Sequence, residues 1–145
     1  MKTNKIFIFI FVLLVSLNGL QCKSTQNSPS KRAMYKSIYI NEFKLTYFRQ
    51  MLIKGYNNSN AVQEIISKDN SGFAEIILSE DDYKLIDSLA TIDNEKMKID
   101  SSLGNKRAEG SQGKRPLGFI LYRYNSKWLD SLANKRYKNS GIKKL

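Results

Sequence analysis

Apolar residues recur every three or four positions through most of the chain, with polar residues between them, which is the spacing of amphipathic α-helices. The first such run is followed by Gly55, a residue well placed to end a helix. Its apolar members are Ile40, Phe43, Tyr47, Phe48, Met51 and Leu52. The pattern therefore predicts a first long helix that ends at Gly55.

Two shorter apolar runs follow the first helix. Residues 57–60 are a cluster of asparagine and serine that forms a turn and can cap a second helix. The inner face of this second helix carries Ala61, Val62, Ile65 and Ile66. Residues 69–72 then interrupt the pattern. A third, short helical stretch is predicted beyond them, and it carries Phe73, Ile76 and Ile77.

Ser79 and Asp82 have the spacing of a capping box, in which the serine caps a helix and the residue three positions on returns the hydrogen bond. Glu80 and Asp81 suit the positive end of the helix dipole. Helix capping explains these acids better than calcium binding or catalysis, because their spacing fits neither an EF-hand nor a carboxylate pair across a cleft. This helix is predicted to run to about Met97. Its buried stripe is expected to consist of Tyr83, Ile86, Leu89 and Ala90.

Residues 101–115 contain three glycines and no apolar periodicity, so they are expected to form a long loop. Pro116 fits the first position of a new element, and residues 117–124 form an apolar run compatible with a strand or a helix. Residues 125–126 can cap a last helix. Its inner face is expected to carry Trp128, Leu129, Leu132, Ala133 and Tyr137, in the core rather than on a sugar-binding platform.

The N-terminus has the layout of a secretory signal. Lys2 and Lys5 precede an apolar run over residues 6–17, which is too short to span a bilayer as a helix. The only cysteine of the chain, Cys22, follows at the cleavage position, which predicts a bacterial lipoprotein whose thiol is acylated there. Gln21 departs from the small residue usual before such a cysteine. Two alternatives are a secreted protein with a free thiol and a short anchor that is never cut.

These patterns define the predicted organisation of the chain. Residues 1–21 form the signal peptide, residues 22–33 a flexible tether, residues 34–138 the helical domain and residues 139–145 a basic tail. The fold class is therefore predicted to be all-α, with a single compact domain of about five helices after the signal peptide and tether.

Composition limits the chemistry. The chain has no histidine, which removes Ser-His-Asp and Cys-His catalysis and the commonest metal ligand. If Cys22 is acylated, no thiol nucleophile remains either. The glycine-rich stretch before Arg115 lacks the spacing of a phosphate-binding loop. We therefore expect no enzyme activity, no cofactor and no metal site, and we expect a binding function.

Charge is uneven along the chain. Residues 62–100 carry ten acidic and four basic residues, whereas residues 101–145 carry two acidic and eleven basic ones. Without Lys2 and Lys5 the remaining chain has 22 basic and 13 acidic residues, a net charge of +9. The two segments either pack together as neighbours or form a bipolar surface that steers a partner. An exported basic protein can meet anionic lipid, a cell-wall polymer or an acidic protein, and nucleic acid is not expected as a partner there.

Four stretches of the chain resemble one family when taken in order. They are residues 48–56, 69–75, 83–90 and 121–132, and together they span about residues 43–133. In this order and spacing they resemble the type VI secretion amidase immunity proteins, in the group paired with the fourth class of amidase effectors. Members with cysteine in the first and last helices can link them. Met51 and Leu121 lie near those places here, so this link is not available.

The resemblance implies a small helical protein that binds and blocks a peptidoglycan amidase effector injected by neighbouring cells. It also implies that a homodimer can form, and that a loop can plug the amidase cleft. We expect the loop of residues 101–115 to be the plug, because of its length and charge. The expected contacts are Lys106, Arg107, Gln112, Lys114 and Arg115.

The acylated Cys22 would hold the protein on the periplasmic side of a bacterial membrane. Three other interpretations stay open at this point. The loop can be a plain solvated connector. The protein can be an envelope lipoprotein that binds cell-wall polymer or anionic lipid. It can also be a structural lipoprotein without an enzyme partner.

Overall fold

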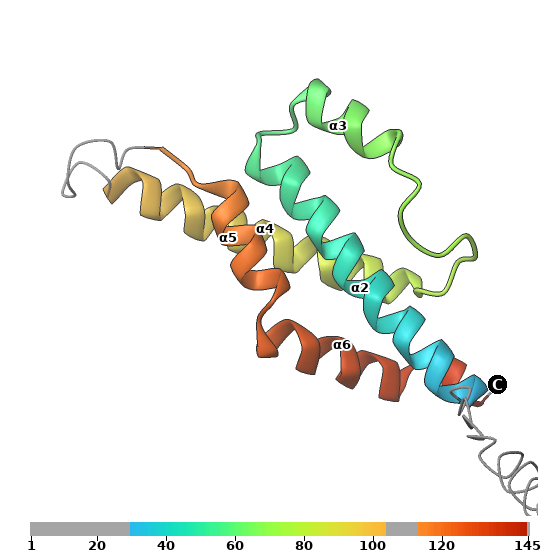
Figure 1. Ribbon diagram of the computed structural model, residues 1–145. Coiled ribbons are helices and arrows are strands. Elements are labelled where there is room, and N and C mark those ends of the chain that lie inside the picture. The colour runs from blue at the N-terminus through green and yellow to red at the C-terminus, as the bar shows by residue number, and fades with distance from the viewer. Residues whose placement is uncertain (1–29, 104–112, 145) are drawn as a thin grey trace, which may run out of the picture.

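The computed structural model describes residues 30–103 and 113–144 of the chain, and Figure 1 shows their arrangement. This part contains helices and no strand, so the prediction of a single all-α domain is confirmed. The helices are α2 (Lys31–Gly55), α3 (Asn60–Ser67), α4 (Glu80–Ser102), α5 (Pro116–Tyr124), α6 (Lys127–Asn139) and the 3-10 helix η3 (Gly141–Lys144).

Helix α2 is the centre of the domain, and α4, α5 and α6 all pack against it. Its buried residues recur at every fourth position, which keeps them on one face of the helix. They are Tyr39, Phe43, Tyr47 and Met51, with Gly55 at the end. The helix ends at Gly55 as predicted. A side chain there would crowd α5, because its Cβ would lie 3.1 Å from Cβ of Pro116.

Helix α2 begins earlier than the sequence pattern predicted. Its first residue is Lys31, and the Ser30 hydroxyl caps it by accepting a hydrogen bond from the Ala33 amide at 3.3 Å. The predicted boundary between tether and domain at residue 34 was therefore wrong by three residues. The first turns are exposed, so they lack the buried apolar stripe from which the helix was recognised.

The connection between α3 and α4 differs from the prediction. No residue of α3 is buried, and the expected helix around Phe73 and Ile76 is an irregular segment that runs back along α2 (Figure 1). Gly72 has a φ of 115°, and the Phe73 amide donates a hydrogen bond to the Glu42 carboxylate of α2 at 2.6 Å. This contact spans 31 positions, so it has no local signal in the sequence.

Helix α4 has the predicted capping box, with both reciprocal hydrogen bonds between Ser79 and Asp82. It continues to Ser102, beyond the predicted end near Met97. Its expected stripe was wrong at Tyr83, which is 45% exposed, and right at Ile86 and Ala90. Asp82, Asp93 and Asn94 take buried positions on this helix instead.

Helices α5 and α6 complete the domain. Residues 116–124 are a helix rather than a strand, with Pro116 at its first position. The Ser126 hydroxyl caps α6 by accepting a hydrogen bond from the Leu129 amide at 3.2 Å, as predicted. Trp128 was expected in the core but is 41% exposed. The predicted tail of residues 139–145 was also wrong in part, because Asn139 ends α6 and residues 141–144 form η3.

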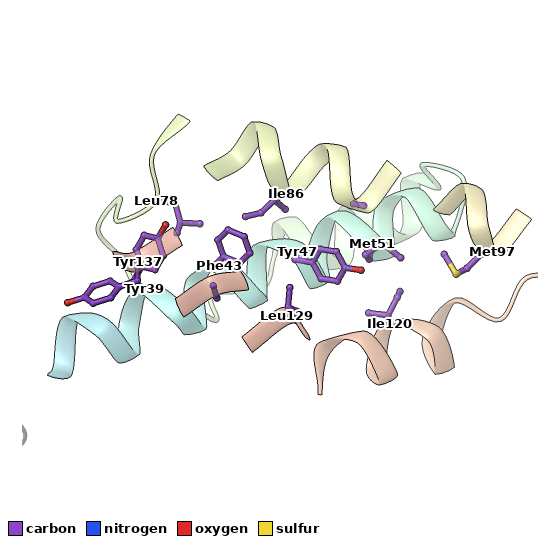
Figure 2. Close-up of a cluster of buried hydrophobic side chains, with 12 residues drawn as sticks. Tyr39, Phe43, Tyr47, Met51, Leu78, Ile86, Met97, Ile120, Leu129 and Tyr137 are labelled. Atoms are coloured by element: carbon purple, nitrogen blue, oxygen red, sulfur yellow. The ribbon is translucent and has the colours of Figure 1, made fainter. Parts of the chain in front are cut away.

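Figure 2 shows one continuous core between α2, α4, α5 and α6. Every member of this cluster of buried apolar residues lies between Tyr39 and Tyr137. The chain from Ser30 onward therefore contains the complete described core. The start of α2 lies beside the end of α6, where the rings of Tyr39 and Tyr137 are 5.6 Å apart. The end of α4 and the start of α5 lie at the other end of the domain (Figure 1).

Candidate functional site

Two buried aspartates on α4 join the helices of the domain. Asp93 is 2% exposed and accepts a hydrogen bond from the Tyr47 hydroxyl of α2 at 2.6 Å. Arg123 of α5 donates two hydrogen bonds to the same carboxylate, at 2.9 Å from Nε and 2.8 Å from a terminal nitrogen. The Lys96 ammonium adds a contact at 2.9 Å. This cluster therefore ties α2, α4 and α5 together at one point.

Asp82, in the first turn of α4, forms a second cluster of this kind. It is 1% exposed and accepts hydrogen bonds from the amide and hydroxyl of Ser79 at 3.0 and 2.7 Å. Arg136 of α6 donates to its other oxygen at 2.7 Å. The ring of Tyr39 on α2 is buried beside this pair. Asp82 thus joins α4 to α6 as Asp93 joins it to α5.

Both carboxylates have a lowered pKa and are therefore ionised at neutral pH. Burial by itself would raise the pKa of Asp93, but hydrogen bonds from Arg123, Tyr47 and Lys96 outweigh it and lower the pKa below its usual value. Hydrogen bonds from Ser79 and Arg136 lower the pKa of Asp82 in the same way. Burial beside these carboxylates raises the pKa of both Tyr39 and Tyr47. Groups held in this way organise the fold and are poor proton carriers near neutral pH.

The sequence pattern revealed only one part of these clusters, the local pair of Ser79 and Asp82. Asp93 and Arg123 are 30 positions apart, and Asp82 and Arg136 are 54 positions apart. For the long-range pairs, the only signal in the sequence was an acidic residue of α4 at a position where the helical spacing predicts a buried apolar one. Both pairs join the acidic segment to the basic one, so these segments do pack in part as neighbours, one of the two arrangements expected from the charge distribution.

A cavity of about 540 Å³ opens between the end of α4 and α5. Apolar and cationic side chains from both helices line it, together with Asp100. The lining residues are Lys96, Met97, Asp100, Arg115, Gly118, Phe119 and Tyr122. Such a mixture suits an apolar group of a ligand or partner that carries negative charge nearby.

The same two helices carry large apolar side chains on the surface. On α5, Tyr122 is 73% exposed, and Leu117 and Leu121 are each more than half exposed. On and just beyond the end of α4, Ile99 and Leu103 are also exposed. We use the name α4–α5 face for these five exposed residues together with the cavity between the two helices, which Tyr122 also lines. Helix α5 buries Ile120 completely and packs Phe119 against the core, whereas Leu117, Leu121 and Tyr122 stay exposed in the described part of the chain.

Two of the predicted contact residues, Lys114 and Arg115, belong to the described part of the chain, and both lie at the end of the domain that holds the cavity. Arg115 is exposed, occupies the N-cap position of α5 without a side-chain capping hydrogen bond, and lines the cavity. The Lys114 ammonium lies 2.5 Å from the Asn57 side-chain oxygen and 3.5 Å from that of Asn94, so it joins this end to the turn after α2 and to α4. Burial, and then the charge of nearby Lys98, lower the pKa of Lys114.

The remaining predicted site residues lie outside the described residues. These are Lys106, Arg107 and Gln112 of the predicted loop and Cys22 of the predicted lipidation site. The predicted loop of residues 101–115 also changes at its first two positions, because Ser101 and Ser102 are the last residues of α4.

Within residues 30–103 and 113–144, no group of histidine, cysteine or acidic side chains is arranged to hold a metal ion. Glu80 pairs with Lys84 at 2.8 Å, and Asp82 is committed to the capping box and to Arg136. In these residues the acids of the α4 N-terminus serve the helix and its packing.

The same part of the chain contains no helix with the length and apolar character needed to cross a membrane.

The fold and its surface define a small all-α domain that exposes an apolar and cationic face at one end. Comparison with protein-family models, curated proteins and solved structures found no match.

Proposed function

We propose that this protein is a membrane-anchored immunity protein that binds and inhibits a peptidoglycan amidase effector delivered by a type VI secretion system. The family resemblance of residues 43–133 supports the class of partner. The α4–α5 face is the observation that carries the proposal, because it supplies a surface suited to a protein partner next to the predicted inhibitory loop.

The composition of the α4–α5 face favours a protein over a polymer. Aromatic and aliphatic side chains that project from a rigid helix give an interface its buried centre, and arginine is enriched around such centres. Tyr122 and Leu121 supply the apolar part here, and Arg115 supplies a cation at the edge of the cavity. A binding site for an anionic polymer would need cations but no exposed apolar centre.

The position of the face also fits an anchored inhibitor. The described chain starts at the end of the domain formed by α2 and α6, on the side where the predicted anchor precedes it. The end of α4 and the start of α5 lie at the opposite end (Figure 1). An inhibitor tethered in this orientation presents its binding surface away from the membrane, where an incoming effector reaches it.

Calorimetry tests the proposal. The chain from residue 22 onward, carrying Cys22→Ser to remove the anchor, is titrated into an exported amidase encoded beside it. We expect saturable binding that survives moderate salt, since apolar contacts are not screened. Tyr122→Ala is expected to weaken binding tenfold or more, on the order of the effect of an interface aromatic residue.

Tyr83→Ala is the matched control, because Tyr83 is another exposed tyrosine on a helix but lies near the start of α4. It is expected to leave binding unchanged. Equal losses from both substitutions would remove the α4–α5 face from the interface. No binding to this amidase or to others of its class would overturn the immunity proposal, and binding to cell-wall polymer that disappears in salt would favour the envelope-polymer alternative.

A further inference from the structure

The end of the domain opposite the α4–α5 face carries a cluster of exposed cations. Three of them, Lys31, Arg32 and Lys36, lie on the first turns of α2. The other two, Lys135 and Lys138, lie on the last turns of α6. We call these five residues the basic end. The two groups are far apart in the sequence, so no single run of charges marks the basic end.

Packing between the two helices brings the basic end together. Tyr137 of α6 is 4% exposed, and its ring packs against Tyr39 of α2. Its hydroxyl also donates a hydrogen bond to the backbone carbonyl of Arg32 at 3.5 Å. The start of α2 and the end of α6, which carry these cations, therefore lie side by side (Figure 1).

None of these five cations forms an ion pair within the described residues. By contrast, Lys68, Lys84 and Lys98 each pair with a glutamate one helical turn away. The buried Asp82, which shares a cavity with Tyr39 and the end of α6, already pairs with Arg136 at 2.7 Å. A cluster of unpaired cations produces a positive potential that attracts an anionic surface.

The position of the basic end in the chain indicates which anionic surface it would meet. Ser30 immediately precedes α2, and only eight positions separate it from Cys22. Even a fully extended segment of that length spans at most about 28 Å. If Cys22 carries the lipid anchor, as the proposed function requires, the start of α2 stays within that distance of the bilayer.

We propose that the basic end docks on the anionic phospholipid headgroups of the membrane that holds the anchor. Docking there would fix the orientation of the domain and direct the α4–α5 face outward. It would also add a second signal to the acyl anchor, as basic residues do beside lipidated segments. This inference rests on the proposed anchoring, but the docking itself can be measured without the anchor or the amidase.

Co-sedimentation with vesicles tests the docking. The chain from residue 22 onward with Cys22→Ser is mixed with vesicles that contain phosphatidylglycerol and, separately, with vesicles of phosphatidylcholine alone. We expect binding to the anionic vesicles only, weakened by salt. Each cation at such a surface contributes about fivefold, so Lys31→Gln/Lys36→Gln/Lys138→Gln is expected to lower the partition on the order of 100-fold.

Lys68→Gln/Lys84→Gln/Lys98→Gln is the matched control, because it removes the same net charge from three exposed lysines outside the basic end. It is expected to change the partition only a few-fold, and circular dichroism confirms that both variants fold. Equal losses in both variants, or equal binding to neutral vesicles, would overturn the proposal. So would binding to soluble polyglutamate as strong as binding to vesicles, which would assign the basic end to an acidic polymer. Inhibition of the amidase by the anchor-free chain is expected to be the same in both variants, so the two proposals can fail separately.

Discussion

At the scale of single residues, Asp93 is the side chain that joins α2, α4 and α5. Its carboxylate is buried and satisfies Tyr47 and Arg123 at once. Removing the charge would leave the Arg123 guanidinium, whose side chain is 19% exposed, without its partner. A buried pair that loses one member costs more than the intact pair contributes, because the remaining charge is still desolvated.

We therefore expect Asp93→Asn to lower the free energy of unfolding by about 3 kcal/mol in urea denaturation. Asp87→Asn is the control, since Asp87 lies on the same helix but is 57% exposed and pairs only with Lys54. Its cost is expected to stay within about 1 kcal/mol. Similar costs for the two substitutions would show that the Asp93 cluster does not hold the helices together.

The pH dependence of stability follows from the two buried carboxylates. In the folded protein the pKa of both Asp82 and Asp93 lies below the usual value of 3.8, so the folded state takes up protons less readily than the unfolded chain. Their contribution is fully present above pH 3.8 and is lost as the pH falls through the folded values. We expect the melting temperature to fall steeply below about pH 4.

The variant Asp82→Asn/Asp93→Asn isolates this effect. It is expected to start from a lower melting temperature at neutral pH and to show a flatter decline between about pH 4 and pH 2. Thermal denaturation followed by circular dichroism measures both curves. A variant curve that runs parallel to that of the unchanged protein would assign the acid sensitivity to other groups.

At the scale of helices, capping distinguishes two starts that look similar in the sequence. Ser79 precedes α4 and forms a complete capping box with Asp82. Ser59 precedes α3, yet its side chain makes no capping hydrogen bond. The difference has a physical consequence, because an uncapped helix start leaves its first amides to water.

We expect Ser79→Ala to lower the free energy of unfolding by about 1 kcal/mol or more, and Ser59→Ala by only a few tenths. Urea denaturation of both variants measures the difference. Equal costs would contradict the assignment of the capping box as a stabilising element. Because Ser79 also orients Asp82 toward Arg136, a larger loss at Ser79 would be consistent with that second role.

Helices with local signals were predictable, whereas the segment between α3 and α4 was not. The end of α2, the start of α4 and the start of α6 each carry their own signal, at Gly55, Ser79 and Ser126. The segment around Phe73 has apolar residues at helical spacing, but its conformation depends on Glu42, a distant residue on α2. Local periodicity cannot report a hydrogen bond across 31 positions.

At the scale of the whole molecule, the sequence indicated the end of the domain that holds the candidate site but not its composition. The glycines and charges of residues 101–115 drew attention to that end, where Arg115 borders the cavity. The exposed face of α5 was not predicted, because Leu117, Leu121 and Tyr122 look like core residues in an apolar run. Only the packing of α5, which buries Ile120 completely, separates inner from outer positions.

We propose different roles for the two ends of the domain. In this proposal the basic end would face the membrane and the α4–α5 face would meet the effector, while two buried Asp–Arg pairs hold the helices between them. Net charge alone could not separate these roles, because both ends carry exposed cations. The exposed apolar side chains at one end and the unpaired lysines at the other distinguish them.

Peptidoglycan cleavage by a candidate amidase effector tests the central claim most directly. The amidase is assayed alone and with increasing amounts of the anchor-free chain. The account predicts that cleavage stops when the two proteins are present in about equal amounts, as expected for a tight complex. Cleavage that continues at the full rate in an excess of folded chain would contradict the account.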